Sequence, residues 1–502
     1  MVHAMRTGAV LLAIGLLFLP NGASLSPLQN GSSWPQFHGD LTLDGIAGGS
    51  APGGSVVYTV NLAPYVPISI SNPLGNDYPY QASPSTDGSN VYVALDNEVI
   101  AVAASSGTLR WNVSLPGGSG GGPIVGTPLV SNGMVYVGQD GGPNRLAALD
   151  AGNGNLAWSM NTPGGGNPSS ASVVEQGGNL VVADLAGDFA WTPESGGAAW
   201  TLPPAPANAQ YFATPSFTTI AGGGPAWVVP DRGNRSLDAW SISGTPLPGF
   251  PMSGNPRMDR LYSSAALVNI TPVGGIAQTW AIFGGEGGAG NPSHLYAVDL
   301  SHPSGVDALT VPAPGSGDSG IRSTPAVVVS GGTAFVYFGT RSGTVSEVEF
   351  QPSSSSTPWG WVWNESTGAP IDASPVVIGG EVIVPSEDGT VYAYRLGGGS
   401  PIWTVNTGAP VYASPAVAGG LCWVVNANGA LVAIGGNGPS SGNPGTTPLG
   451  PGLSSGGMLW IVLLLVGIVV AAVIVLILVI TRRTRPGPPV APNAPPTPPG
   501  PH

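Results

Sequence analysis

The chain has 502 residues, of which 79 are glycine, 53 are proline and only 8% are charged. Glycine and proline approach the level of low-complexity sequence, but 14 tryptophans and regularly placed aliphatic residues indicate a packed, turn-rich core. The formal net charge is −13, and all 13 basic residues are arginine. This balance argues against nucleic-acid binding, because phosphate recognition needs clustered cations. Sparse charge fits an acidic habitat, and a GC-rich genome accounts for it equally well.

Residues 1–23 have the layout of a secretory signal peptide. Arg6 precedes an apolar stretch from Ala9 to Leu19, which is followed by Pro20 and small residues up to Ala23. We therefore expect residues 1–23 to direct export and to be removed near Ala23.

A second apolar segment, Met458 to Ile480, has 23 residues without a charge. As a helix it would be roughly 34 Å long, enough to cross a bilayer core. A Gly/Ser/Pro linker, residues 437–457, precedes it, and residues 481–502 carry arginines and then a proline-rich tail. Because positive residues stay cytoplasmic, the pattern predicts a single-pass cell-membrane protein with an extracytoplasmic main part and a cytoplasmic C-terminus.

Five Asn-x-Ser/Thr sequons lie on the predicted outer side, and their asparagines are candidates for glycosylation: Asn30, Asn112, Asn234, Asn269 and Asn364. The single cysteine, Cys422, sits in an apolar run from Leu421 to Val425. We expect it to be a buried small hydrophobic residue.

The middle of the chain, residues 34–436, is built from a repeat. A short phrase, Ser or Thr followed by Pro or Ala and an apolar strand, recurs eight times, with its third position at 84, 128, 171, 215, 265, 325, 375 and 415. Short strands separated by Gly and Asp turns follow each phrase, so each repeat predicts one antiparallel blade. A period of this length is typical of β-propellers.

The two ends of the repeat region decide the number of blades. The eighth phrase supplies only three strands, ending near Ile434, whereas Val56 to Val60 is an apolar strand without a blade of its own. Pairing these two would leave no open sheet edge. We therefore predict an all-β, eight-bladed propeller closed by an N-terminal strand. Seven blades is the alternative, if Gly222 to Pro312 forms one irregular blade.

The stretch ALDAGNGNLAW, Ala148 to Trp158, resembles the repeats of pyrroloquinoline-quinone (PQQ)-like, quinoprotein alcohol dehydrogenase-like propellers. The resemblance implies that a tryptophan on the fourth strand docks between adjacent blades, where a large flat ring packs well. Blades four and five carry Phe250 and Leu309 near that position. The lead-in Trp34 to Gly45 also resembles the segment that precedes such repeats. The expected docking tryptophans are Trp111, Trp158, Trp200, Trp361 and Trp403.

PQQ-dependent dehydrogenases of this family use adjacent cysteines, an Asp base and a calcium site. This chain has one cysteine, so the cysteine pair cannot exist, and we expect no PQQ, no calcium and no catalytic residue. His294 and His302 lie close in sequence but in turn-like flanks, so we expect no metal site. The zinc-protease and phosphate-loop motifs are absent from the sequence.

The loops around a propeller channel form a face that can bind a partner. Clustered Tyr, Arg and Asp there would suit binding, since Tyr and Arg are enriched at interaction hot spots, although loops hold polar residues in any protein. The residues just before the first strands are Tyr80, Tyr211, Arg257, Asp259, Arg260, Tyr262, Arg322, Asp372 and Tyr412. The turns between second and third strands add Asp140, Asp231, Arg232, Arg235, Arg341, Glu387 and Asp388.

Three functions stay open. The first is a non-enzymatic binding or scaffold module at the cell surface with an extracellular protein or glycan partner. The family includes a bacterial outer-membrane assembly lipoprotein, but that protein is anchored at an N-terminal cysteine that this chain lacks, and a helix anchor with sequons suits an archaeal surface better. The second is a membrane-anchored PQQ-dependent oxidoreductase. The third is a structural surface-coat or adhesion protein.

Overall fold

A computed structural model describes residues 33–65, 82–115, 124, 126–139, 146–161, 172–183, 189–196, 200–201, 208–254, 258–288, 290–312, 318–352, 357–436 and 500. Contacts divide the chain into two units, residues 1–440 and 441–502. The expected signal peptide, linker and membrane helix lie outside the described residues, as does the tail apart from residue 500. Within the described part of the chain, no helix is long and apolar enough to span a membrane.

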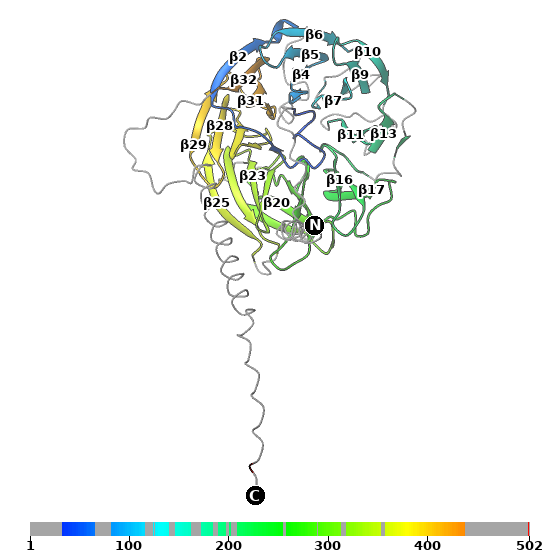
Figure 1. The fold of residues 1–502 in the computed structure, drawn as a ribbon, viewed down its shortest axis with the longest axis vertical. Coiled ribbons are helices and arrows are strands. Elements are labelled where there is room, and N and C mark those ends of the chain that lie inside the picture. Colours follow the sequence, from blue (N-terminus) through cyan, green and yellow to red (C-terminus); the bar gives the residue numbers. More distant parts are fainter. Residues whose placement is uncertain are drawn as a thin grey trace, which may run out of the picture. The chain divides into compact units, whose positions relative to one another are not determined.

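The described strands form eight sheets arranged around a ring, which confirms the eight-bladed propeller (Figure 1). The consecutive strands of each blade form an antiparallel meander that runs outward from the channel. Blade 1 contains β3 (Ser85–Thr86), β4 (Asn90–Leu95), β5 (Glu98–Ala103) and β6 (Leu109–Ser114). Blade 2 contains β7 (Leu129–Ser131), β8 (Met134–Gly138), β9 (Leu146–Asp150) and β10 (Leu156–Met160). Blade 3 contains β11 (Val174–Gln176), β12 (Asn179–Ala183), β13 (Phe189–Pro193) and β14 (Trp200–Thr201).

Blades 4 to 8 complete the ring. Blade 4 contains β15 (Ser216–Thr219), β16 (Pro225–Asp231) and β17 (Ser236–Ser241), and blade 5 contains β18 (Ala266–Ile270), β19 (Gln278–Gly284), β20 (Ser293–Asp299) and β21 (Asp307–Val311). Blade 6 contains β22 (Ala326–Ser330), β23 (Thr333–Gly339), β24 (Thr344–Phe350) and β25 (Trp359–Ser366). Blade 7 contains β26 (Val376–Ile378), β27 (Glu381–Pro385), β28 (Thr390–Arg395) and β29 (Pro401–Asn406). Blade 8 contains β30 (Ala416–Ala418), β31 (Leu421–Val425) and β32 (Ala430–Gly435). The chain before the first blade supplies β1 (Ile46–Ala47), β2 (Ser55–Asn61) and a single 3-10 turn, Ala63–Tyr65.

The stretch from Gly222 to Pro312 belongs to two blades, so the seven-blade alternative is wrong. In blade 4, residues 246–252 take the place of a fourth strand through two isolated bridges, Leu237 to Met252 and Trp240 to Pro246. Phe250 lies in that segment and is buried in the core.

The N-terminal strand β2 closes the ring, as predicted. It pairs antiparallel with β32 from Ser55 opposite Gly435 to Asn61 opposite Ala430. The register shifts just before Tyr58, whose hydroxyl donates to the Ala104 carbonyl of blade 1 at 2.8 Å. The first and last parts of the propeller therefore share one sheet.

Aromatic residues at a shared register shift dock the outer strands of blades 1, 2, 6 and 7 and the closing strand β2 on the next blade. The indole N–H of Trp111 donates to the Ala151 carbonyl at 2.9 Å, and that of Trp158 to the Glu194 carbonyl at 3.0 Å. Each ring lies on a glycine of the neighbouring blade, where a Cβ would come within 2.8 Å of it. Tyr58 takes this role at the closure, and neither its position nor its residue type matched the tryptophan pattern.

The prediction of Trp361 as a docking residue was wrong. The register shift in β25 places Trp363 at the docking position, where its ring centroid lies 5.2 Å from that of Tyr394 in blade 7. Trp361 is 43% exposed. Trp361 and Trp363 are two residues apart in β25, so only the register shift determines which of them takes the docking position. The side chain of Trp200 lies outside the described part.

The repeated Ser or Thr of each phrase forms a ring of hydrogen bonds around the channel. Its hydroxyl oxygen accepts the backbone N–H of the equivalent residue in the preceding blade, at 2.8–3.1 Å in seven of the eight blade junctions as described. In the third blade this residue is Ser172, so the third repeat starts two residues later than position 171 predicted. The hydroxyl ring consists of Ser83, Thr127, Ser172, Thr214, Ser264, Thr324, Ser374 and Ser414, all buried.

We expect loss of one ring hydroxyl to destabilise the propeller. Ser374→Ala leaves the buried N–H of Thr324 without its acceptor, at a cost of about 1–3 kcal/mol in the free energy of unfolding. The matched control is Ser330→Ala, at an exposed end of β22, with a change within about 0.5 kcal/mol. Denaturant melts of the full-length chain compare the two; equal effects would contradict a structural role for the ring.

The segment from Trp34 to Ala47, here the plug segment, crosses the centre of the ring (dark blue in Figure 1). Its backbone carbonyls accept N–H groups from the inner strands of six blades, with donors Thr86, Val130, Phe217, Leu267, Val327 and Val377 at 2.7–2.9 Å. β1, at its end, adds a parallel strand to β26. The plug segment thus satisfies inner sheet edges that would otherwise face an empty channel.

His38 holds the plug segment in its bend. Its ring nitrogens lie 2.6 Å from the Leu43 carbonyl and 2.8 Å from the Pro375 carbonyl of blade 7. Gly45 has φ +71°, and a Cβ there would lie 2.5 Å from the imidazole. The contact therefore requires glycine.

Gly45→Ala should displace the plug segment. We expect it to lower the free energy of unfolding by about 2 kcal/mol more than Gly133→Ala, because overpacking adds to the cost of positive φ. Gly133 is the matched control, since it has φ +77° but a Cβ there would meet no described atom within 4 Å. Denaturant melts of both variants measure the difference, and equal losses would show that the contact with His38 does not matter.

Two buried carboxyl groups carry raised pKa values. Burial, and then the charge of Asp40, raise the pKa of Asp44 to about 8. Burial, and then the charge of Asp231, raise that of Asp238 to about 7. Above about pH 4 the unfolded chain releases these protons while the folded chain keeps them. The contribution of these two groups to the free energy of unfolding is therefore largest below about pH 4 and is lost as the pH rises towards 8.

We predict a higher melting temperature at pH 5 than at pH 8. Asp44→Asn should flatten this slope, because the amide oxygen can still accept the Ile46 N–H while the titrating proton is gone. Calorimetric melts of the full-length chain across this range make the measurement. A melting temperature that rises towards pH 8 would contradict the predicted direction.

Candidate functional site

A cavity of about 60 Å³ occupies the centre of the propeller. The hydroxyl ring surrounds it and Phe37 of the plug segment contributes to its lining. The other lining side chains are aromatic or charged and come from blades 4 to 8: Phe212, Tyr262, Arg322, Asp372 and Tyr412. The cavity is therefore polar around its circumference, with its described charges on one side.

The structure brings four of the nine predicted face residues to this cavity: Tyr262, Arg322, Asp372 and Tyr412. Tyr211 is instead a core residue, fully buried, with its hydroxyl 2.9 Å from Asp238. Tyr80 and Arg257 lie outside the described residues.

The remaining two predicted face residues have other contacts. Asp259 Oδ2 lies 2.9 Å from His294 Nδ1, and the backbone of Arg260 bridges to that of Glu286. Neither lines the cavity.

Of the seven predicted turn residues, Arg341 and Glu387 join the charged groups beside the cavity. Asp231 is structural, because its Oδ1 accepts the N–H groups of Gln210, Gly233 and Asn234. Asp388 is exposed and accepts the Tyr392 hydroxyl. Arg235 lies in the β16–β17 turn, and Asp140 is outside the described part.

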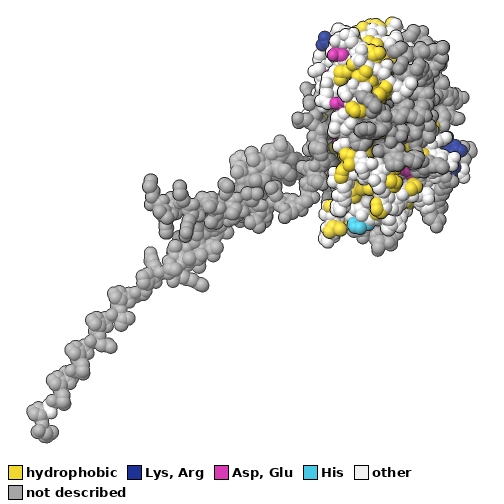
Figure 2. Space-filling model, turned by 90° about the vertical axis from the view of Figure 1, so that its right-hand side faces the viewer, with side chains coloured by type: hydrophobic (Ala, Val, Ile, Leu, Met, Phe, Trp, Pro, Cys, Tyr) yellow, Lys and Arg dark blue, Asp and Glu magenta, His cyan; other side chains and the backbone are white. Residues whose placement is uncertain are grey.

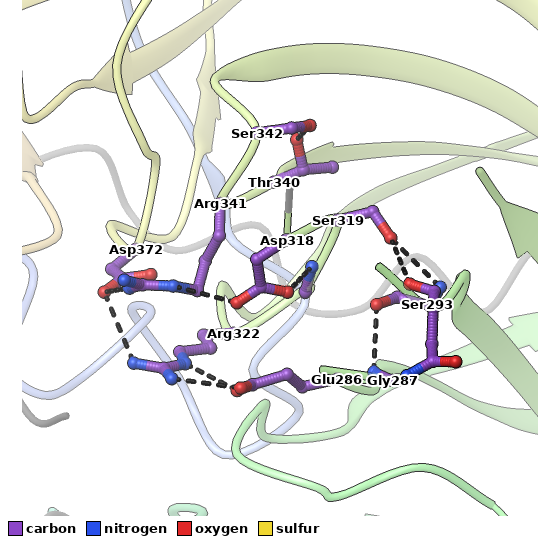
Figure 3. Close-up of polar contacts among 12 residues, drawn as sticks. Glu286, Gly287, Ser293, Asp318, Ser319, Arg322, Thr340, Arg341, Ser342 and Asp372 are labelled. Atoms are coloured by element: carbon purple, nitrogen blue, oxygen red, sulfur yellow. Dashed lines mark hydrogen bonds and ion pairs between the residues drawn. The ribbon is translucent and has the colours of Figure 1, made fainter. Parts of the chain in front are cut away.

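Arg322 and Arg341 organise a network of buried ion pairs (Figure 3). Arg322 Nε and Nη2 donate to the two carboxylate oxygens of Glu286 at 2.7 and 3.2 Å. Arg322 Nη1 lies 3.9 Å from Asp372 Oδ2, which also accepts Arg341 Nη1 at 2.6 Å. Arg341 Nε lies 3.3 Å from Asp318. We call Glu286, Asp318, Arg322, Arg341, Asp372 and Glu387 the mouth cluster.

Glu286 and Asp318 were missed by sequence reasoning. Each is an isolated charge in a glycine-rich loop, Glu286 after β19 and Asp318 before β22. Because only 8% of the residues are charged, a single charge in a glycine-rich loop was the sequence signal that could have identified these two residues. Charged side chains are also sparse on the side of the propeller in Figure 2, where hydrophobic groups are scattered among neutral ones.

Two carboxyl oxygens of the mouth cluster have no donor among the described residues: Asp372 Oδ1 and Glu387 Oε1. The Asp372 side chain is only 2% exposed. Burial, and then the charge of Asp372, raise the pKa of Glu387 to about 7. A single proton between the two carboxyl groups would satisfy both oxygens.

Tyr262 links the mouth cluster to the aromatic side of the cavity. The guanidinium carbon of Arg322 lies 5.0 Å from its ring centroid, and that of Arg232 lies 5.2 Å away. Arg232 also lies 4.9 Å from the Phe212 ring. These contacts hold aromatic and cationic groups beside one another.

The histidines and the cysteine do not join the site. His294 pairs with Asp259 and His302 with Asp299, and no described group of three or more His, Cys, Asp or Glu could hold a metal ion. Cys422 is fully buried in β31, as expected, and burial raises the pKa of its thiol.

The described residues do not fit the cofactors that PQQ-dependent relatives use. Calcium needs six to eight oxygen ligands, whereas Asp372 already accepts a guanidinium on one oxygen and Arg322 lies beside it. A cavity of about 60 Å³ takes a few water molecules and is far below the size of ordinary cofactor sites. No reaction step through PQQ or calcium follows from this arrangement.

The fold and the site define a PQQ-like propeller with a charged channel mouth. A family profile described as outer membrane protein assembly factor BamB matches residues 45–215 and 356–438, just over half of the chain. The chain belongs to this PQQ-like family. Among curated protein sequences, none matches it.

Solved structures of two kinds share the fold. Quinohemoprotein alcohol dehydrogenase from Comamonas testosteroni is 14% identical, with a TM-score of 0.58 over 84% of this chain and 83% of that one. A europium-containing methanol dehydrogenase is 11% identical, with a TM-score of 0.56 over 80% and 89%. BamB from Moraxella catarrhalis is 15% identical, with a TM-score of 0.52 over 76% and 99%. At these identities the likeness concerns the fold alone.

Proposed function

We propose that the chain is a non-enzymatic binding scaffold that stands outside the membrane and presents its channel mouth to a protein partner. The observation that carries the proposal is the mouth cluster, which joins six charged residues in a chain with few charges, and of which Arg322 and Asp372 line the cavity. Arg and Tyr at a buried centre with a polar surround are typical of interaction hot spots.

The family match supports a protein-binding role, because the profile is described by an assembly factor. A dehydrogenase role has less support. The fold is shared with both kinds of protein, but the carboxylates of Glu286 and Asp372 accept hydrogen bonds from arginines, and the single cysteine lies within a buried strand. Proteins that share a fold can differ in function, so the residues of the site decide between the two roles.

The proposed location outside the membrane rests on residues 1–23 and Met458 to Ile480. Two sequon asparagines, Asn112 and Asn364, are exposed on outer strands and suit glycan attachment. Asn234 and Asn269 are half-buried and already hydrogen-bonded, to Asp231 and Thr279. Asn30 lies outside the described residues.

Site-specific photocrosslinking in membranes of the producing cell tests the scaffold function. A photoreactive residue at position 388, exposed in the β27–β28 turn at the mouth, should give one discrete crosslinked protein. The same residue at position 87, exposed in the β3–β4 turn at the other end of the channel, is the matched control and should give none. Crosslinks from both positions to other copies of this chain would instead indicate a surface coat.

Adding PQQ and calcium to the purified full-length chain tests the dehydrogenase alternative. We expect no cofactor absorbance band and no change in melting temperature. A band together with a shift of several degrees would contradict the scaffold function and identify a cofactor-dependent enzyme.

A further inference from the structure

The mouth cluster lacks donors and not acceptors. Asp372 Oδ1 and Glu387 Oε1 accept no hydrogen bond from any described residue, and the Asp372 side chain is almost completely buried at the cavity. A buried acceptor without a donor is costly. When Glu387 is ionised and no proton lies between the two carboxyl groups, a ligand that satisfies both oxygens must therefore bring N–H or O–H groups.

The arginines beside these oxygens are already engaged. Arg322 uses Nε and Nη2 on Glu286 and directs Nη1 towards Asp372 Oδ2. Arg341 uses Nε and Nη1 on Asp318 and Asp372. An anionic ligand would have to break these pairs, whereas a cation would not.

The balance of charge also favours a cation. The mouth cluster has two guanidinium groups against four carboxyl groups, so it is negative even while Glu387 holds a proton. Tyr412 lines the cavity together with Asp372, and burial, followed by the charges of Glu387 and Asp372, raises its pKa. An aromatic ring beside carboxylates is a common surrounding for ammonium and guanidinium groups.

A metal ion does not suit the same place. Two free oxygens are too few for calcium, and the neighbouring guanidinium groups repel a divalent ion. The cavity volume of about 60 Å³ accommodates the end of a side chain.

We propose that the mouth cluster is a slot for one lysine or arginine side chain of the protein partner, whose head group donates to Asp372 Oδ1 and Glu387 Oε1. This inference rests on the proposed scaffold function and specifies what the mouth recognises. Partner binding would replace the proton between the two carboxyl groups with the ligand's cation. One proton is released to water for each cation that binds.

The exchange makes affinity depend on pH. Asp372, Arg341, Arg322 and Tyr412 are the charged or titratable groups that act on Glu387. With the pKa of Glu387 at about 7, the ionised fraction rises about tenfold between pH 6 and pH 8. Affinity for a cation should rise by about the same factor.

The probes are Nα-acetyl-lysine methylamide and Nα-acetyl-arginine methylamide, titrated into the full-length chain by calorimetry and ligand-observed NMR. Norleucine and citrulline analogues are the neutral controls. We expect the cationic probes to bind at least about tenfold more tightly than the neutral ones at pH 8, with proton release, and more weakly at pH 6. Equal binding of cationic and neutral probes would overturn the proposal.

Three variants locate the binding. Glu387→Gln should weaken cation binding by about tenfold and remove its pH dependence, because the amide donates permanently to Asp372 Oδ1. Asp372→Asn should weaken it as well, with near-UV circular dichroism confirming the fold. Asp388→Asn is the matched control, one residue from Glu387 but exposed and outside the mouth cluster, and should leave binding unchanged. Cation binding that persists in Glu387→Gln would place the site elsewhere and overturn the slot.

The two proposals fail separately. Crosslinking at position 388 without preferential cation binding would leave the scaffold and remove the slot. Preferential, pH-dependent cation binding without a crosslinked partner would leave the slot and remove the protein scaffold.

Discussion

The propeller depends on a hydrogen bond between neighbouring blades, from a backbone N–H to the hydroxyl of the next Ser or Thr. The bond repeats at seven of the eight blade junctions as described, and removing one hydroxyl leaves a buried donor in the neighbouring blade. The repeated phrase in the sequence therefore marks the residues whose hydrogen bonds join neighbouring blades.

Inside this ring, the plug segment and the mouth cluster complete the channel in different ways. The plug segment satisfies inner-strand N–H groups with its carbonyls and places Phe37 at the cavity. The mouth cluster leaves two carboxyl oxygens without donors. The backbone of the plug segment is thus bonded to the blades, whereas the mouth cluster has capacity for a ligand, which is the asymmetry expected of a binding face on a rigid scaffold.

Sequence alone predicted the propeller, its eight blades and the closing strand, because these follow from a repeat and a strand count. It placed Trp361 instead of Trp363 at the docking position and the third phrase two residues early, because a bulge and a loop change register without changing composition. For the site it identified Arg322 and Asp372 but not Glu286. Their pairing depends on adjacent blades facing each other, which no spacing within a single blade reveals.

The closing strand also determines how the domain meets mechanical load. The last strand of the propeller, β32, is not an edge strand. It lies between β31 and β2 and is hydrogen-bonded to both. Force applied through the C-terminal end of the chain therefore acts on an interior strand. Extraction must rupture two ladders at once, whereas an outermost strand could be peeled away one bond at a time. A domain closed in this manner resists being pulled apart from that end.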